Sequence, residues 1–321
     1  MLLLVFLLLL TLYLCIRLFV SRKSDSLTCL VGKTALVTGG NSGLGYATSA
    51  LLASRGCRVI IADRDNAERT VEEIKRKTGN DQISYKYLDL SSLKLTREFA
   101  NVLKKTEKKI DILINNAGIG VGAKLATEDG LNTVMQVNYF GAFLLTHLLL
   151  DLLKASDSAR IMFLGSISIF SNNLTMENFN LIKKDGTTTL KDLYSNSKLC
   201  DVLAAQEFAK KLKKYGIRAN SVDPGAVKTD IFRRASVIAK SRFFDTVTGV
   251  VLSICGTDSF GGAQTIFHVV TSDELRDQTG QHFSYLLRFF KPSILKDQKF
   301  CDEIWKRTEE LVKLSPEERI S

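Results

Sequence analysis

From residue 31 onward, short apolar runs alternate with stretches of helical periodicity, and this alternation constrains the fold more than any other feature. The runs that we expect to form buried strands are 33–40, 57–65, 83–92, 110–118, 159–166 and 217–225. Helical patterns separate them, at 45–56, 66–79, 128–155 and 193–214. Strands that alternate with helices predict a parallel sheet covered on both faces. The expected fold class is therefore α/β, with a doubly wound parallel sheet.

The domain organisation follows from the absence of any linker, repeat or low-complexity stretch in the 321 residues. Folds of the α/β class often run to about 250 residues as one unit. We therefore expect a single α/β domain over residues 31–285. Residues 1–23 precede it as a separate segment, and residues 286–321 follow it as an amphipathic extension.

The first twenty residues, MLLLVFLLLLTLYLCIRLFV, are apolar except for Arg17. Cleaved signal peptides carry positive charge before the apolar run, whereas Arg22 and Lys23 follow it here. The run therefore predicts a retained membrane anchor, with the body of the protein on the cytosolic side. We expect the endoplasmic reticulum membrane, and a shallow insertion in one leaflet, compatible with lipid droplets, is the alternative because Arg17 shortens the run.

Charge and cysteine content limit the partners. The net charge of +10 favours anionic lipid headgroups and anionic cofactors. Zinc-finger spacing, RNA-binding motifs and arginine-rich arms are absent from the sequence, so we expect no nucleic acid. The six cysteines have no paired spacing and the three histidines have no ligand neighbours, so we expect no metal and a reducing compartment.

A glycine-rich turn, TGGNSGLG at 38–45, lies between the first expected strand and the first helix. Gly39, Gly43 and Gly45 allow the backbone to turn tightly and to approach a pyrophosphate at a helix N-terminus. The spacing fits the usual dinucleotide fingerprint only loosely. The context of strand, turn and helix nevertheless favours a dinucleotide cofactor over a plain turn.

The end of the second expected strand carries Asp63 and Arg64. A carboxylate at this position accepts hydrogen bonds from both ribose hydroxyls and repels a 2′-phosphate, whereas an arginine would pair with that phosphate. The two residues act in opposite directions. NAD is slightly favoured because of Asp63, and NADP stays open.

Tyr194 and Lys198 are four residues apart within YSNSK. On a helix this spacing places the phenol and the ammonium side by side. A nearby ammonium favours the phenolate and lowers the tyrosine pKa, so that the phenol can serve as a general acid–base.

These residues resemble the short-chain dehydrogenase/reductase family. Five motifs stand in the family's order and spacing: TGGNSGLG, NNAG at 115–118, Ser166, YSNSK at 194–198 and DPGAVKT at 223–229. The resemblance implies a Rossmann-like fold and an oxidoreductase that transfers a hydride between a nicotinamide cofactor and a CH–OH group.

The resemblance also implies roles for individual residues. Tyr194 exchanges a proton with the substrate oxygen, Lys198 lowers its pKa and holds the nicotinamide ribose, Ser166 bonds the substrate oxygen, and Asn138 holds a relay water. The implied cofactor-binding residues are Gly39, Asn41, Ser42, Gly43, Leu44, Gly45, Asp63, Arg64, Asp89, Leu90, Asn116, Ala117, Gly118, Tyr194, Lys198, Pro224, Gly225, Val227 and Thr229. Within this set Asp89 and Leu90 match the adenine contacts, and residues 224–229 embrace the nicotinamide amide.

Two departures from the family pattern concern the serine. The strand that leads to Ser166 contains IMFLGSIS, where the family usually has two adjacent serines, and Ser168 is a nearby competitor for the role. The insert at 169–190 lengthens the gap to Tyr194, and we expect it to lie beside the substrate mouth as a flap.

Within the family, the chain looks most like the retinol dehydrogenase group, through YSNSKLCDVLAAQEFAKKL, GAQTIFHVV and TGQHFSYLLRFFKPS with the later IWKRTEELV. This implies a lipid-dissolved, apolar substrate such as a retinoid, with a steroid or another lipid alcohol as the alternative. Candidate pocket residues are Phe170, Phe243, Phe244, Leu286 and Phe290. A cofactor-binding scaffold on membranes or lipid droplets is the competing class, and a homodimer stays open.

Overall fold

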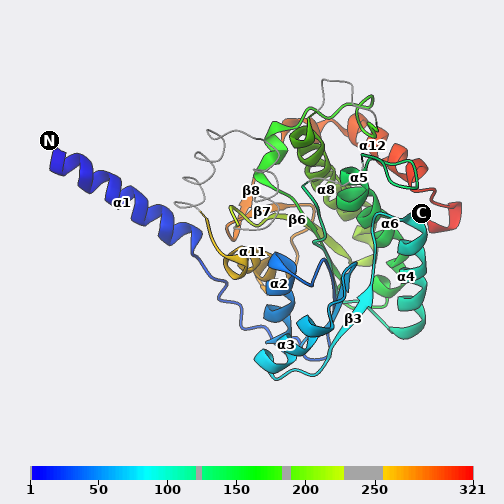
Figure 1. The fold of residues 1–321 in the computed structure, drawn as a ribbon, viewed down its shortest axis with the longest axis horizontal. Helices are drawn as coiled ribbons and strands as arrows, with labels where there is room; N and C mark the ends of the chain where they lie inside the picture. The colour runs from blue at the N-terminus through cyan, green and yellow to red at the C-terminus, as the bar shows by residue number, and fades with distance from the viewer. Residues whose placement is uncertain (1, 121–124, 183–188, 228–255, 321) are drawn as a thin grey trace.

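The computed structural model describes residues 2–120, 125–182, 189–227 and 256–320 (Figure 1). Its strands are β1 (Thr34–Thr38), β2 (Arg58–Asp63), β3 (Ile83–Tyr87), β4 (Ile112–Asn115), β5 (Arg160–Leu164), β6 (Arg218–Asp223), β7 (His282–Ser284) and β8 (Leu287–Phe289). Its α-helices are α1 (Leu2–Val20), α2 (Gly43–Ala53), α3 (Glu68–Thr78), α4 (Leu93–Thr106), α5 (Thr133–Met135), α6 (Gly141–Leu148), α7 (Leu150–Lys154), α8 (Leu190–Leu212), α11 (Ser259–Thr271) and α12 (Gln298–Leu311). The remaining helical segments are the π-helix η1 (Gln136–Phe140) and the 3₁₀ turns η2 (Ile167–Ser171), η3 (Lys213–Tyr215), η4 (Ser293–Lys296) and η5 (Pro316–Glu318).

The strands form one sheet in the order β3-β2-β1-β4-β5-β6-β7-β8. Strands β1 to β7 are parallel, and β8 pairs antiparallel with β7. The predicted α/β fold with a doubly wound parallel sheet is confirmed. Strand order reverses between β1 and β4, and in such sheets ligands bind at the carboxyl ends of the strands beside that reversal.

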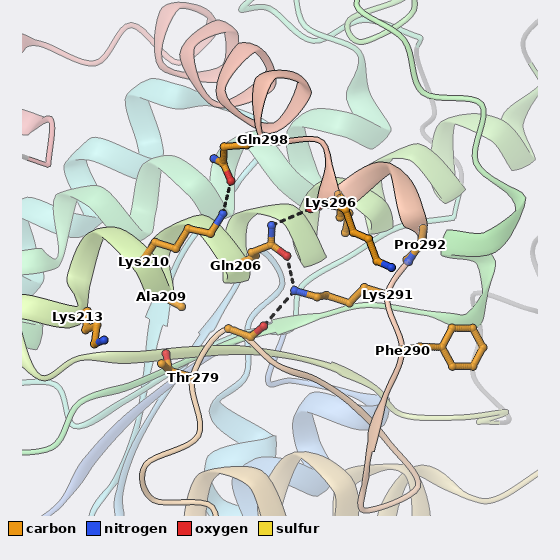
Figure 2. Close-up of a pocket in the computed structure, with 12 residues that line it drawn as sticks. Gln206, Ala209, Lys210, Lys213, Thr279, Phe290, Lys291, Pro292, Lys296 and Gln298 are labelled. Atoms are coloured by element: carbon orange, nitrogen blue, oxygen red, sulfur yellow. Dashed lines mark hydrogen bonds between the residues drawn. The ribbon is translucent and has the colours of Figure 1, made fainter.

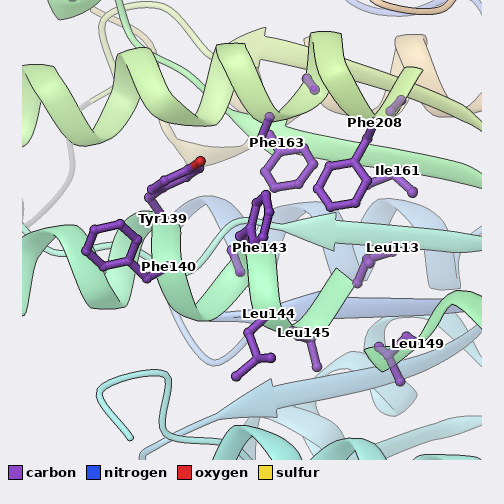
Figure 3. Close-up of a cluster of buried hydrophobic side chains, with 14 of the residues drawn as sticks. Leu113, Tyr139, Phe140, Phe143, Leu144, Leu145, Leu149, Ile161, Phe163 and Phe208 are labelled. Atoms are coloured by element: carbon purple, nitrogen blue, oxygen red, sulfur yellow. The ribbon is translucent and has the colours of Figure 1, made fainter. Parts of the chain in front are cut away.

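Alternate residues of the central strands pack into two apolar layers. In β1, Leu36 belongs to one cluster, whereas Ala35 and Val37 belong to the other. The first cluster packs against α4, α6, α8 and α12, and the second against α2, α3 and α11. Figure 3 shows the aromatic part of the first cluster between α6 and the sheet. Both sheet faces are therefore covered, which explains why the strands β1, β2, β4 and β5 are mainly apolar.

The C-terminal residues join the same sheet and core. Strand β8 lengthens the sheet beyond residue 285. The Trp305 ring of α12 lies 4.7 Å from the Phe143 ring and 4.9 Å from the Phe208 ring, measured between centroids. Residues 286–320 therefore pack on the domain that precedes them, and the expected boundary at 285 falls between two paired strands.

The N-terminal helix α1 projects from the body of the molecule (Figure 1). Its last turn is tied down, because Arg17 Nη1 donates to the Gly256 carbonyl at 3.0 Å. The chain after it is held by Ser24, whose amide donates to Gln264 Oε1 at 3.0 Å. No helix within the four described ranges combines the length and the apolar character needed to cross a bilayer.

Candidate active site

The glycine turn connects β1 to α2 at the carboxyl edge of the sheet. Gly39 has φ +65°, a conformation that costs a side-chain-bearing residue energy. Gly45 packs directly on that turn, since a Cβ there would lie 2.1 Å from the Gly39 carbonyl oxygen. Asn116 braces the same turn through Nδ2, which donates to the Thr38 carbonyl at 2.7 Å. The turn can therefore accept a ligand closely, but it cannot accept larger residues.

The first turn of α2 is open to an acceptor. Its N-cap residue, Ser42, makes no side-chain cap hydrogen bond, whereas the caps of α4, α8, α11 and α12 do. The leading amides of a helix lack intrahelical partners and carry partial positive charge, which suits a phosphate. This open end, together with the close-packed glycines, fits the pyrophosphate of a dinucleotide, with Asn41, Gly43 and Leu44 around it.

Asp63 ends β2 beside this turn. Its carboxylate accepts from the Asn41 amide at 3.2 Å and from the Asp65 amide at 3.0 Å. Arg64 points to solvent and forms a loose ion pair with Asp65 at 3.7 Å. The structure thus places the carboxylate, rather than the guanidinium, against the glycine turn.

Asp89, Leu90 and residues 116–118 form the other wall. Asp89 Oδ1 accepts from the Ser91 amide at 2.8 Å, and Leu90 is buried. Thr38 was missed in the sequence: its Oγ1 accepts from the amides of Asn116 and Ala117, both at 3.0 Å. A threonine inside an apolar strand that ends at a glycine turn was the available signal for it.

The catalytic candidates meet where α8 crosses the end of β5. Ser166 follows β5, and its hydroxyl lies close enough to the Tyr194 phenol to lower the pKa of that phenol. Lys198 is buried, and its Nζ donates to the Leu164 carbonyl at 2.8 Å and lies 6.0 Å from the centroid of the Tyr194 ring. A Cβ on Gly118 would lie 3.6 Å from that Nζ, so the cofactor wall adjoins the lysine.

Ser168, the competing serine, makes no such contact. Its Oγ is buried and has no hydrogen-bond partner within the described residues. Its amide donates to Ser166 Oγ at 3.2 Å. The structure therefore brings Ser166, and not Ser168, to Tyr194.

The tyrosine pKa shifts opposite to the expected direction. Burial raises the pKa of Tyr194, and this outweighs the lowering by Lys198 and by the Ser166 hydrogen bond. Burial also opposes charge on Lys198, yet the neighbouring Asp201 and Tyr194 hold the Lys198 pKa above its ordinary value. The ammonium thus favours the phenolate as predicted, but its effect is smaller than the cost of burying that phenolate.

Asn138 lies in η1, where the expected helix 128–155 is interrupted. Its Oδ1 accepts from the Ile119 amide at 2.7 Å, and its Nδ2 donates to Ser197 Oγ at 2.9 Å. One helix was expected over 128–155, but α5, η1, α6 and α7 occupy that range. A π-helical turn widens the helix, and such turns are frequent at functional sites.

The segment after β6 closes the site. The Gly225 amide donates to Asp223 Oδ1 at 3.0 Å, and the Ala226 amide donates to the Tyr285 hydroxyl at 3.2 Å. Pro224 and Val227 lie on the same stretch. Thr229 lies outside the described residues, as do Phe243 and Phe244 of the expected substrate pocket.

Of the insert at 169–190, the structure describes residues 169–182 and 189–190. The Asn173 amide donates to Asn196 Oδ1 at 3.1 Å, which fixes the insert beside the start of α8. Phe170 and Phe290 are in ring contact at 4.9 Å and are partly exposed. Leu286 has φ +68° next to β7.

A hollow of about 650 Å³ lies elsewhere, between the second half of α8 and residues 279–298. Figure 2 shows Lys291 inside it, with Nζ directed at Gln206 and at the Gly280 carbonyl. Among the predicted residues only Phe290 lines this hollow. No group of histidine, cysteine and carboxylate side chains suited to a metal was found within the described part of the chain.

Comparisons with known proteins agree with this geometry. The family model described as short chain dehydrogenase matches residues 33–180. Human retinol dehydrogenase 13 is 34% identical over 285 residues, covering 88% of this chain and 85% of that protein. Bovine retinol dehydrogenase 12 is 35% identical over 286 residues, covering 88% and 87%.

Two solved structures also resemble this one. An uncharacterized protein from Mycobacterium paratuberculosis superimposes with a TM-score of 0.70 at 26% identity, covering 90% of this chain and 96% of that chain. Pseudomonas aeruginosa RhlG, in an active-site complex with NADP, has a TM-score of 0.63 at 25% identity, covering 80% and 95%.

The chain belongs to the short-chain dehydrogenase/reductase family, as the motifs predicted. It is a nicotinamide-dependent oxidoreductase that acts on alcohols and carbonyls.

Proposed function

We propose that this protein interconverts an apolar alcohol of the retinol type and its carbonyl. The observation that carries the proposal is the convergence of Ser166, Tyr194 and Lys198 beside Gly118. The retinol dehydrogenases, at 34–35% identity over most of the chain, support the substrate class. Two exposed aromatic side chains in ring contact with each other, Phe170 and Phe290, are proposed to offer apolar contacts to such a substrate.

The proton chemistry is assigned to Tyr194. In the oxidation direction its phenolate accepts the proton of the substrate hydroxyl, and in the reduction direction its phenol returns a proton to the carbonyl oxygen. Ser166 donates a hydrogen bond to the same oxygen, and Lys198 stabilises the phenolate. When bound, the nicotinamide supplies the hydride exchange at carbon.

The proposed dinucleotide site consists of the glycine turn, Asp63 and residues 116–118. Asp63 stands against the turn and Arg64 does not, which supports NAD over NADP. Asn138 is proposed to shape the proton path through η1, because it links the Ile119 backbone to Ser197 on α8.

A substrate screen tests the function. Retinoids, steroids and fatty aldehydes are each offered with NAD and NADP in both redox forms, and we expect retinoid turnover to be fastest. Preference for steroids would replace the retinoid proposal with the steroid one.

Tyr194→Phe should lower kcat at least about a hundredfold while cofactor binding, measured by fluorescence quenching, persists. Near-normal turnover in this variant would sink the assignment of Tyr194.

We further propose that α1 associates with the cytosolic face of endoplasmic reticulum membranes. Its side chains Leu10, Leu14 and Leu18 are exposed, Leu18 by 74%. A variant that begins at Ser24 keeps the contact with Gln264 and should be released from membranes by high salt. Retention would assign the contact to residues 286–321 instead. Protease should digest the domain on sealed microsomes without detergent, and full protection would refute the orientation.

A further inference from the structure

A third ionisable side chain continues the face of α8 that carries Tyr194 and Lys198. Asp201 lies three residues after Lys198 and seven after Tyr194, a spacing that places all three on one side of a helix. Asp201 Oδ2 accepts a hydrogen bond from Lys198 Nζ at 3.0 Å, and both side chains are almost fully buried. We propose that Asp201 is a positioning residue that fixes the Lys198 ammonium and sets how strongly its charge acts on Tyr194. The proposal rests on the acid–base roles proposed above.

The contacts of Lys198 show which groups its ammonium charge acts on. Its Nζ donates to the Asp201 carboxylate and to the Leu164 carbonyl, while the Tyr194 ring centroid lies 6.0 Å away. The ammonium therefore bonds the Asp201 carboxylate directly, whereas the centre of the Tyr194 ring lies farther from it. When Asp201 is ionised, Lys198 and Asp201 together present a weak dipole to Tyr194, and when Asp201 is neutral they present a full positive charge.

Asp201 is held in a place where ionisation is costly. Its Oδ1 is buried and has no hydrogen-bond partner within the described residues. Burial raises the pKa of Asp201 to about 7, although the Lys198 ammonium pulls it down. The carboxyl group can therefore change its charge near neutral pH.

Other ionisable groups face this pair from every neighbouring element. Cys200 on α8 and Tyr139 on η1 both face Asp201, and burial raises the pKa of each well above its ordinary value, so both stay neutral. Cys301 on α12 faces Cys200, and burial raises its pKa to about 11. Asp223 at the end of β6 faces Tyr194, and burial raises its pKa to about 6. Among the described groups named here, Asp201, Asp223, Lys198 and Tyr194 are thus left to set the local charge near neutral pH.

Asp201→Asn tests the proposal. The asparagine oxygen can still accept from Lys198, but the negative charge is gone, so the ammonium acts fully on Tyr194. Asp201 and Tyr194 are separated by about 10 Å of helix rise, so the apparent pKa of Tyr194 should fall by about one unit. In pH–rate profiles, both the rising limb of alcohol oxidation and the falling limb of carbonyl reduction should move to lower pH by that amount.

Matched variants separate this effect from a general loss of structure. Asp201→Glu keeps the charge and should keep the wild-type profile. Glu207→Gln removes a carboxylate from the same helix, one that bonds Lys210 and not Lys198, and should leave the profile in place. Should Asp201→Asn fail to fold, Asp201→Ser is the second charge-free variant, and the same shift is required of it.

An unshifted profile in the charge-free variant, or a shift to higher pH, overturns the proposal. The second result would mean that Lys198 loses its proton once its partner is neutral. Tyr194→Phe, measured in parallel, distinguishes a failure of the proposed function from a failure of the role of Asp201 alone. If it stays active, the proposed function fails; if it is inactive and the Asp201→Asn profile is unmoved, only the role of Asp201 fails.

Discussion

Two buried carboxylates at opposite edges of the sheet, Asp111 and Asp201, each pair with lysine, yet their pKa values move in opposite directions. Asp111 precedes β4 and accepts from Lys33, Lys109, Ser156 Oγ at 2.7 Å and the Thr34 amide at 2.9 Å. Burial opposes its charge, but these donors hold the Asp111 pKa below its ordinary value. Within the described residues the Asp201 carboxylate has Lys198 as its single donor, and burial raises the pKa of Asp201 to about 7.

The two pKa values move in opposite directions because the number of hydrogen-bond donors around each carboxylate differs, and not because of the paired lysine. A carboxylate with several donors stays ionised and serves as a structural joint, whereas one with a single donor stays close to neutrality and can respond to pH. The amino edge of the sheet is therefore built for stability, and the carboxyl edge keeps charges that are incompletely balanced.

The largest expected difference between the two edges is in turnover. Lys198→Met removes the ammonium that favours the Tyr194 phenolate, so kcat should fall at least about a hundredfold. Lys33→Met removes a lysine from the Asp111 pair and should leave kcat unchanged. Initial rates of both variants give the two kcat values, and circular dichroism checks that both variants fold. Equal rates in the two variants would break the comparison.

The next largest effect is on stability. Asp111→Asn leaves buried donors without a charged acceptor and should lower the free energy of unfolding by about 2 to 3 kcal/mol. Glu72→Gln removes a carboxylate from an exposed pair with Lys75 and should change it by less than about 0.5 kcal/mol. Urea denaturation measures both values, and similar losses would contradict a structural role for Asp111.

The pH dependence of these losses has a defined sign. The folded pKa of Asp111 is depressed, so its contribution is present above its unfolded pKa of about 3.9 and is lost as pH falls through the folded value. The difference in the free energy of unfolding between wild type and Asp111→Asn should therefore disappear in acid.

The folded pKa of Asp201 is raised to about 7, so its ionisation costs stability progressively as pH rises from about 4 to that value.

The smallest effect concerns a third carboxylate, Asp63, whose oxygens accept from backbone amides and from no lysine within the described residues. Asp63→Asn keeps an oxygen for the Asn41 amide but removes the charge that repels a 2′-phosphate. The ratio of kcat/KM with NADP to that with NAD should rise about tenfold, equivalent to about 1.4 kcal/mol. Asp65→Asn is the control, and an unchanged ratio for Asp63→Asn would mean that its charge does not select the cofactor.

Much of the sheet and of the site is predictable from the sequence because the signals come from residues that are close together in the chain. The six expected strands β1 to β6 are apolar runs, and the glycine turn and the Tyr194–Lys198 spacing are short-range patterns. Strands β7 and β8 have only three residues each, too few for a periodic signal. The interruption of helix 128–155 at Asn138 depends on contacts with Ile119 and Ser197, which are made across the fold.

The sign of the Tyr194 pKa shift was not predictable for the same reason. Spacing shows that Lys198 is near, but burial depends on what the rest of the chain places above the ring. Asp201 is a similar case: an acid three residues after a lysine is usually a surface pair, and only the packed structure shows that both side chains are buried.

The late position of α12 in the chain bears on how the protein is made. Trp305 completes an aromatic cluster with Phe143, His147 and Phe208. During synthesis at about 5 to 20 residues per second, α6 and α8 emerge well before the residues that cover them. A chain that ends before residue 298 lacks the Trp305 ring, so Phe143, His147 and Phe208 are covered on that side only when α12 has been made.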